Sequence, residues 1–144
     1  MPTRTAHTAW TGGLQDGSGQ VDLRSSKVGT FDVSFPKRTA EDAGGTTSPE
    51  ELIAAAHAAC FSMALSAQLG GVNLTPESIN TNVTLTMEKL DSGWTITDSH
   101  LDVVGRVPGA DAATFQKYAE AAEKGCPVSK VLNAKISMTA KLEG

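Results

Sequence analysis

Residues 48–65 constrain this chain more than any other stretch, because they predict a long helix with a defined start. Ser48 can act as the N-cap, Pro49 suits the first helical position, and Glu51 stands where a capping box places its acidic residue. Only one histidine and one serine interrupt the apolar residues that follow. A helix that is apolar almost all round is expected to be buried. One of the two cysteines of the chain, Cys60, lies near its middle.

Length and charge limit the class of protein. At 144 residues, the chain predicts a single domain spanning residues 1–144. The net charge of −4 argues against a nucleic-acid partner or an anionic membrane surface. The apolar run within 52–65 is too short and too rich in alanine to predict a membrane span. No apolar leader follows Met1, and only two cysteines are present, so we expect a cytoplasmic protein in a reducing compartment.

The other segments predict an α+β fold with mainly antiparallel sheets and two main helices. Hydrophobic alternation favours three strands before the long helix, the third running through Phe35 and ending at Pro36. A change of parity near residues 98–100 indicates a β-bulge. The expected order is βββ-α-ββ-α-(short α)-β. The predicted elements after the long helix are strands within 82–88 and 94–107, a helix over 111–124, a short helix from Pro127 and a last strand over 134–142.

Several kinds of catalytic or binding site find no support in the residue spacing. The two cysteines are far apart in the sequence, and His7, His57 and His100 show none of the paired spacing of zinc sites. The glycine pairs near the N-terminus precede strands and not a helix, so they predict turns and not a phosphate loop. The sequence therefore predicts neither a metal ion nor another cofactor.

The two thiols remain as candidates for chemistry, and they admit more than one interpretation. Cys60 can be a small buried hydrophobic residue, or it can form a dyad with His57 on the same helix. Cys126 precedes a helix that starts at a proline, where backbone N–H groups favour a thiolate. One thiol in a buried helix and one at a helix start are also the pattern of a peroxidatic and a resolving cysteine. Arg38 is the candidate cation for such a thiolate.

Two segments carry a resemblance to a known family. Residues 49–65, Pro-Glu-Glu-Leu-Ile-Ala-Ala-Ala-His-Ala-Ala-Cys-Phe-Ser-Met-Ala-Leu, and residues 125–129, Gly-Cys-Pro-Val-Ser, resemble the OsmC/Ohr family of osmotically inducible and organic-hydroperoxide-resistance proteins. Both segments are most similar to the OsmC branch. The resemblance extends over essentially the whole chain, with the same order of elements.

The resemblance implies a thiol-dependent peroxidase that acts in oxidative and osmotic stress. Cys60 corresponds to the peroxidatic thiol, Cys126 to the resolving thiol with which it forms a disulfide, Arg38 to the activating arginine, and Glu50 to the carboxylate that orients it. Lys37 is the competing cation, although a bidentate role favours arginine. The implied substrates are organic hydroperoxides and, more weakly, hydrogen peroxide. The implied reductant is an external dithiol of lipoyl or thioredoxin type.

The resemblance also implies an intertwined homodimer with an OsmC-like fold, and helix geometry gives a reason for it. Glu50 and Cys60 are ten residues apart on one helix, which is about 15 Å along its axis. A single arginine can hardly bridge both within one chain. We therefore expect Arg38 and Glu50 of one subunit to face Cys60 and Cys126 of the other. The alternatives are a redox-inactive ligand-binding or thiol-sensor protein on the same fold and, ranked last, a hydrolase with Cys60 as nucleophile.

Overall fold

The computed structural model describes all residues of the chain, 1–144. It contains two three-stranded sheets and four helices, so the predicted α+β class is confirmed. Two units can be distinguished, Met1–Leu52 and Ile53–Gly144, and each is described by itself. The assignment of 1–144 to one domain stays a prediction.

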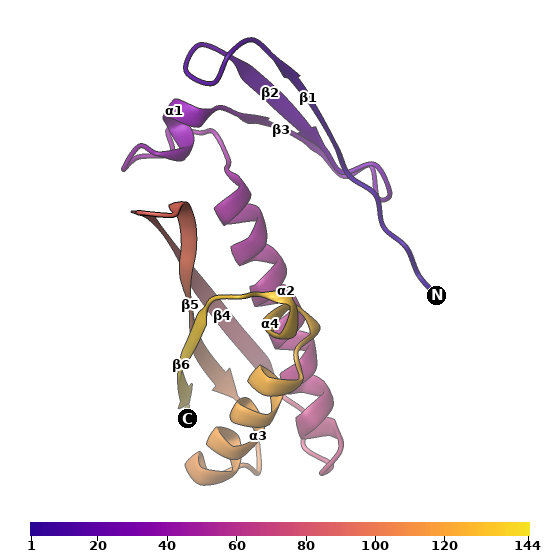
Figure 1. Ribbon diagram of the computed structural model, residues 1–144. Coiled ribbons are helices and arrows are strands. Elements are labelled where there is room, and N and C mark those ends of the chain that lie inside the picture. The colour runs from indigo at the N-terminus through magenta and orange to yellow at the C-terminus, as the bar shows by residue number, and fades with distance from the viewer. The chain divides into compact units, whose positions relative to one another are not determined.

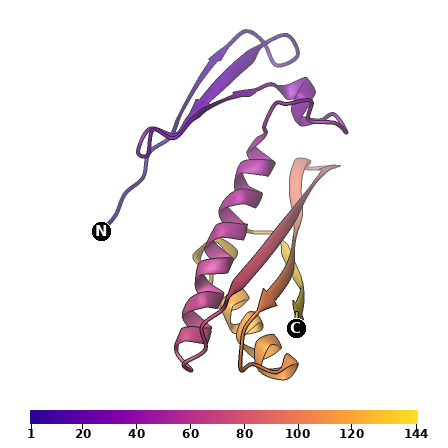
Figure 2. The same ribbon diagram turned by 180° about the vertical axis from the view of Figure 1, so that it is seen from behind.

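The first unit contains the predicted antiparallel meander. Its strands are β1 (His7–Thr11), β2 (Ser18–Asp22) and β3 (Thr30–Val33), in the order β1-β2-β3 (Figures 1 and 2). Both pairs are antiparallel. The three-strand prediction is therefore confirmed.

The end of this meander differs from the prediction. Strand β3 ends at Val33, and a short helix, α1 (Phe35–Arg38), follows it where the alternation of Phe35 had predicted strand. Ser34 caps this helix by accepting a hydrogen bond from the Lys37 N–H at 3.3 Å. Pro36 fits the first turn because its fixed φ matches a helix and its missing N–H is not needed there. The proline thus helps to start a helix, and α1 ends at Arg38.

The predicted start of the long helix, α2 (Pro49–Gly70), is confirmed. The Glu51 N–H donates to the Ser48 hydroxyl at 3.1 Å, and the Leu52 N–H donates to the Ser48 carbonyl at 3.1 Å. The Glu51 carboxylate accepts from the Thr47 hydroxyl and not from the Ser48 N–H. The N-cap therefore forms, but the reciprocal half of the predicted capping box does not.

Helix α2 is not buried all round, contrary to the prediction. One face is fully buried, and its residues recur every four positions, as one side of an α-helix requires. The opposite face consists of small and flexible apolar side chains that are exposed in the single chain, with Met63 at 72% exposure. The buried residues are His57, Phe61, Leu65 and Leu69, and the exposed ones include Ala55, Ala56, Ala59, Met63 and Ala67.

Helix α2 is also longer than the apolar run that the sequence suggested. With 22 residues, it is long and apolar enough to cross a membrane, judged by length and composition only. The prediction that the run is too short therefore fails for the complete helix. The face formed by Phe61, Leu65 and Leu69 belongs to the hydrophobic core, as is usual for the core helix of a globular domain.

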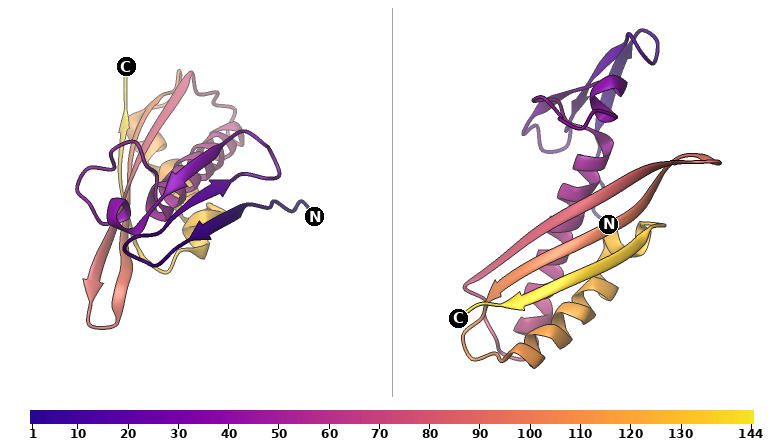
Figure 3. Two further views of the ribbon diagram at one scale, coloured as in Figure 1. Left: turned by 90° about the horizontal axis from the view of Figure 1, so that it is seen from above. Right: turned by 90° about the vertical axis from the view of Figure 1, so that its left-hand side faces the viewer.

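The second unit contains β4 (Ser78–Leu90), β5 (Gly93–Arg106) and β6 (Lys135–Leu142), in the order β4-β5-β6. The helices lie on one face of this sheet (Figure 3). Strands β4 and β5 form an antiparallel hairpin, whereas β5 and β6 are parallel. The prediction of mainly antiparallel sheets is confirmed, with this one parallel pair among them. A parallel pair needs a crossover connection, and α3 (Ala112–Gly125) with α4 (Pro127–Val131) supplies it.

The predicted β-bulge occurs in β5. Thr86 pairs with Asp98, but the next residue of β4, Met87, pairs with Ile96. Thr97 is therefore the extra residue, one position before the predicted range, and its hydroxyl oxygen is buried without a hydrogen bond. The bulge explains how the earlier part of the strand can bury residues of one parity while the later part buries residues of the other parity.

The core of the second unit lies between this sheet and the helices. Asp111 caps α3 by accepting from the Thr114 N–H at 2.7 Å, as predicted. The core combines residues of α2, β5 and α3 with one of the two cysteines. Its buried members are Phe61, Leu65, Leu69, Leu101, Val103, Val107, Phe115, Ala119, Ala122 and Cys126.

One close contact in this core gives a prediction for stability. A Cβ atom at Gly105 of β5 would lie 2.5 Å from Cε1 and 2.6 Å from Cζ of Phe115, which is 1% exposed. We expect Gly105→Ala to lower the free energy of unfolding by about 1–3 kcal/mol, because the buried ring must shift. Urea unfolding measures this difference. Gly70→Ala is the matched control, since nothing lies within 4 Å of its added Cβ; equal unfolding midpoints for both variants would contradict the prediction.

Candidate active site

The second unit brings the two cysteines together. Cys60 of α2 is partly buried, Cys126 is fully buried, and both are free thiols. Each thiol shifts the pKa of the other, so the two cysteine side chains are close neighbours. Residues far apart in the sequence therefore meet, as a peroxidatic and resolving pair requires. Their individual roles stay predictions.

Local structure explains why each thiol lies where it does. Cys60 precedes Phe61, whose fully buried side chain fixes this turn of α2 in the core. Cys126 connects α3 and α4: its N–H donates to the Ala122 carbonyl at 2.8 Å, and its own carbonyl accepts from the Lys130 N–H at 3.1 Å. Helix α4 starts at Pro127, as predicted. The backbone of both helices thus holds Cys126 against α2.

The pKa values of the two thiols shift in opposite directions. Burial raises the pKa of Cys60, and the neighbouring Cys126 adds to this effect, although the backbone N–H of Val128 opposes it. Burial also acts to raise the pKa of Cys126, but the N–H and hydroxyl of Ser129, the Val128 N–H and the Cys60 thiol outweigh it and lower that pKa. In the single chain, Cys126 is therefore the more acidic thiol.

The first unit holds the predicted arginine and carboxylate as an ion pair. The Arg38 Nη2 donates to Glu50 Oε1 at 2.6 Å, and its Nε lies 3.0 and 3.1 Å from Oε1 and Oε2. The Glu50 side chain is 11% exposed and that of Arg38 is 33% exposed. Arg38 ends α1 and Glu50 is in the first turn of α2. This two-nitrogen contact fixes the guanidinium plane, as an orienting carboxylate would.

The competing cation, Lys37, has different surroundings. A Cβ atom at Gly44 would lie 2.7 Å from the Lys37 Nζ, so this ammonium group lies against the loop that follows α1. The ion pair with Glu50 is made by the guanidinium of Arg38. Geometry within the first unit therefore favours Arg38 as the predicted activating residue.

Arg38 borders an apolar hollow of about 440 Å³ in the first unit. Aromatic and aliphatic side chains form most of its lining, and Arg38 is the one charged residue among them. Such a hollow suits a molecule with an apolar body and one polar group. The lining residues are Thr8, Trp10, Leu14, Val21, Val33, Ser34, Phe35, Arg38, Pro49 and Leu52.

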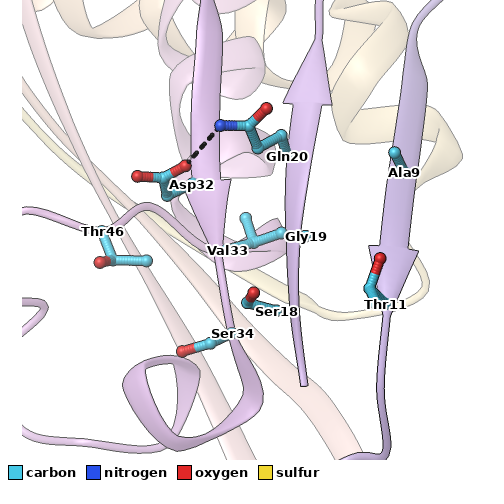
Figure 4. Close-up of a pocket in the computed structure, with 9 residues that line it drawn as sticks. All are labelled: Ala9, Thr11, Ser18, Gly19, Gln20, Asp32, Val33, Ser34 and Thr46. Atoms are coloured by element: carbon cyan, nitrogen blue, oxygen red, sulfur yellow. Dashed lines mark hydrogen bonds between the residues drawn. The ribbon is translucent and has the colours of Figure 1, made fainter.

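A second hollow, of about 530 Å³, borders the same sheet and is more polar (Figure 4). All three strands and the loop residue Thr46 contribute to it. Gln20 Nε2 donates to Asp32 Oδ1 at 3.1 Å across its edge. None of the predicted site residues lines it. It is therefore not part of the candidate active site.

His57 is fully buried and pairs with two serines. Its Nδ1 lies 2.8 Å from the Ser99 hydroxyl oxygen, and its Nε2 lies 2.7 Å from that of Ser129. Both ring nitrogens are thus occupied, which leaves neither for the proposed dyad with Cys60. No group of three or more His, Cys, Asp or Glu side chains is placed to hold a metal ion.

Sequence reasoning missed the two serines. Ser99 lies in a strand of alternating polarity, and no sequence signal there distinguishes a buried serine from an exposed one. Ser129 lies in segment 125–129, three residues after Cys126. That spacing returns a side chain to the same turn of a helix and was the available signal.

Comparison with known proteins places this geometry in a family. The family model described as OsmC-like protein matches residues 41–141. The chain belongs to the OsmC-like family. The resemblance found in segments 49–65 and 125–129 is therefore confirmed.

Individual OsmC-like relatives match almost the full length of the chain. It is 43% identical to "Peroxiredoxin OsmC" of Escherichia coli over 93% of this chain and 92% of that protein. It is 32% identical to "Organic hydroperoxide resistance protein OhrA" of Bacillus subtilis over 96% of this chain and 95% of that protein. The crystal structure of OhrB of Bacillus subtilis superimposes with a TM-score of 0.68 at 26% identity, covering 96% of this chain and 98% of that one.

Proposed function

We propose that this protein is a thiol-dependent peroxidase that reduces organic hydroperoxides, with Cys60 as peroxidatic and Cys126 as resolving thiol. The observation that carries the proposal is the proximity of these two thiols, one on α2 and the other at the junction of α3 and α4. The names of the relatives, a peroxiredoxin and organic hydroperoxide resistance proteins, support the same reaction class. The reaction uses no cofactor, because sulfur carries all the redox change.

The proposed reaction begins with the Cys60 thiolate. It attacks the distal oxygen of ROOH, so that an S–O bond forms as the O–O bond breaks. The thiolate is oxidised to a sulfenic acid, the peroxide is reduced, and the departing alkoxide takes a proton to become ROH. Arg38 stabilises the thiolate and the charge on the departing oxygen, and Glu50 orients Arg38.

The second thiol completes the cycle. The Cys126 thiolate attacks the Cys60 sulfur of the sulfenic acid, an S–S bond forms, and hydroxide leaves and is protonated to water. An external dithiol, of lipoyl or thioredoxin type, then reduces the Cys60–Cys126 disulfide by exchange and is itself oxidised to a disulfide. We assign the protein to the cytoplasm, where such reductants keep thiols reduced.

The active site is proposed to be shared between two copies of the chain. Glu50 and Cys60 are ten residues apart on α2, about 15 Å along its axis. In the single chain, the pKa of Cys60 is raised and not lowered, mainly by burial, so its activating cation has to come from elsewhere. The exposed alanines and Met63 of α2 also need an apolar partner, which an intertwined homodimer would supply.

The apolar lining of the Arg38 hollow favours organic hydroperoxides over hydrogen peroxide. Trp10, Phe35 and Leu52 can contact the organic part of a substrate while the guanidinium faces the peroxide oxygen. Hydrogen peroxide has no such apolar part and gains nothing from these contacts. The substrate order expected is therefore cumene and tert-butyl hydroperoxide above hydrogen peroxide.

A direct assay tests the proposed function. The purified protein is mixed with cumene hydroperoxide and dihydrolipoamide or thioredoxin, and peroxide consumption is followed with mass spectrometry of the oxidised enzyme. We expect catalytic turnover and a peptide cross-linked through Cys60 and Cys126. A protein that neither turns over peroxide nor forms this bond would instead fit the rival, a redox-inactive ligand-binding or sensor protein.

A further inference from the structure

A buried hydrogen-bond chain leads from the sheet to Ser129, three residues after one of the two cysteines. It consists of Ser99 on β5, His57 on α2 and Ser129 on α4, joined through distances of 2.8 and 2.7 Å. Ser99 and His57 are fully buried and Ser129 is 8% exposed. Burying three polar side chains is costly even when they are paired, and the same helix face is otherwise filled by phenylalanine and leucine. The chain therefore calls for an explanation beyond packing.

The protonation of His57 restricts the direction of these hydrogen bonds. Burial lowers the pKa of His57, so the ring is neutral, with one N–H donor and one bare nitrogen acceptor. Each serine hydroxyl can donate one hydrogen bond and accept others. When Nε2 carries the proton, Ser99 donates to Nδ1, and Nε2–H donates to the Ser129 oxygen. The Ser129 hydroxyl hydrogen is then free to point elsewhere.

Ser129 also faces Cys126. The two residues are three positions apart in one helical turn, and both are buried. The N–H and the hydroxyl of Ser129 are among the groups that lower the pKa of the Cys126 thiol. The Ser129 hydroxyl pairs with the His57 ring at 2.7 Å and is a near neighbour of the Cys126 thiol. With Nε2 protonated, its hydrogen is available for donation to the sulfur.

We propose that His57, acting through Ser129, is a positioning residue that holds a hydrogen-bond donor against the Cys126 thiolate. This inference rests on the proposed function, because it concerns the thiol that attacks the Cys60 sulfenic acid. The titratable group that faces Cys126 from α2 is Cys60, and the groups that lower the pKa of Cys126 are backbone N–H groups, the Ser129 hydroxyl and the Cys60 thiol. A neutral network is thus what stabilises the negative charge needed for disulfide formation.

Thiolate titration tests the inference in a Cys60→Ser background, where Cys126 is the only thiol. We expect Ser129→Ala and His57→Leu to raise the pKa of Cys126 by about one pH unit, the size of a lost hydrogen bond to a charged group. Ser129→Thr keeps the hydroxyl, and His57→Gln keeps a donor near the position of Nε2, so both should stay near the parent. Thiolate absorbance in the ultraviolet reports the titration directly.

The kinetic counterpart uses enzyme that retains Cys60. In Ser129→Ala, sulfenic acid formation should keep its rate, whereas disulfide formation below the pKa of Cys126 should slow about tenfold. The control is Ser62→Ala, which removes a different partly buried hydroxyl of α2, bonded to Thr81 at 2.7 Å, and should change neither rate. If His57→Leu does not fold, the Ser129→Ala and Ser129→Thr pair carries the test alone.

The outcomes separate this inference from the proposed function. An unchanged Cys126 pKa in folded Ser129→Ala, or an equal rise in Ser62→Ala, overturns the role of the chain while leaving the peroxidase cycle intact. A wild-type protein that forms no sulfenic acid or disulfide overturns the peroxidase cycle. In that case the titration of the Cys60→Ser variants still reports whether His57 and Ser129 stabilise the Cys126 thiolate.

Discussion

Replacing Cys60 by serine is expected to reduce peroxidase activity more than about 10³-fold, because a serine hydroxyl cannot supply the thiolate that breaks the O–O bond. The rate to measure is peroxide consumption in the presence of excess dithiol. The substitution removes one partly buried sulfur and leaves the core residues of α2 in place. We therefore expect the variant to unfold at nearly the wild-type urea concentration, so that the loss is one of chemistry.

The matched variant is Cys126→Ser, which should separate the two thiol roles. It should still reduce one equivalent of hydroperoxide, because Cys60 remains, but it should not form the internal disulfide. The Cys60 sulfenic acid should accumulate and be trapped by dimedone, and excess peroxide should oxidise it further to the sulfinic acid. Mass spectrometry of the trapped peptide locates the sulfenic acid.

This pair of variants matters because the single chain gives Cys126 the lower pKa. If acidity within the chain decided the roles, peroxide would attack at Cys126, and Cys60→Ser would yield a trapped sulfenic acid on that residue. Exposure instead favours Cys60 as the thiol that peroxide reaches, because Cys60 is partly exposed and Cys126 is fully buried. A dimedone adduct on Cys126 in the Cys60→Ser protein would reverse our assignment.

Many features of the fold were predictable because their signals are local. Ser48 and Pro49 define the start of α2, Asp111 that of α3, and Pro127 that of α4, and each depends only on neighbouring residues. The change of parity in β5 located the bulge to within one residue of Thr97. Local backbone chemistry was sufficient for these features.

Other features were not predictable in the same way. The alternation around Phe35 looked like strand, and only the hydrogen bond of Ser34 to the Lys37 N–H shows that Pro36 starts a helix. The parallel pairing of β6 depends on the path of the crossover helices, which no pattern within β6 records. Ser99 and Ser129 became visible as a network only when the fold brought them to His57.

In the candidate site, too, some features were predictable from sequence and others only from the fold. Motif similarity identified Cys60 and Cys126, and the fold brings them together. The Arg38–Glu50 pair was inferred from the resemblance, and the structure gives it bidentate geometry. The pKa directions could not be inferred from sequence, because they depend on burial and on which N–H groups face each sulfur. Because the pKa of Cys60 is raised in the single chain, experiment has to show which subunit supplies its activating cation.

That question leads to the second large effect, which concerns mixed dimers. Arg38→Met and Cys60→Ser homodimers should each be inactive, because one lacks the activating cation and the other the nucleophile. A purified heterodimer with one subunit of each kind should recover about half of the wild-type activity, since a two-fold dimer then contains one site with both residues intact. Co-expression with two affinity tags isolates this species, and peroxide consumption measures it.

The recovery follows from the way each subunit would contribute to two sites. If Arg38 activated Cys60 of its own chain, both chains of the heterodimer would be defective and no activity would return. Lys37→Met in place of Arg38→Met is the control for the neighbouring cation, and we expect its homodimer to remain active, because Lys37 lies against Gly44 and does not pair with Glu50. A heterodimer that stays inactive although its subunits are folded and associated would exclude the shared site. An inactive Lys37→Met homodimer would move the activating role from the guanidinium to the ammonium group.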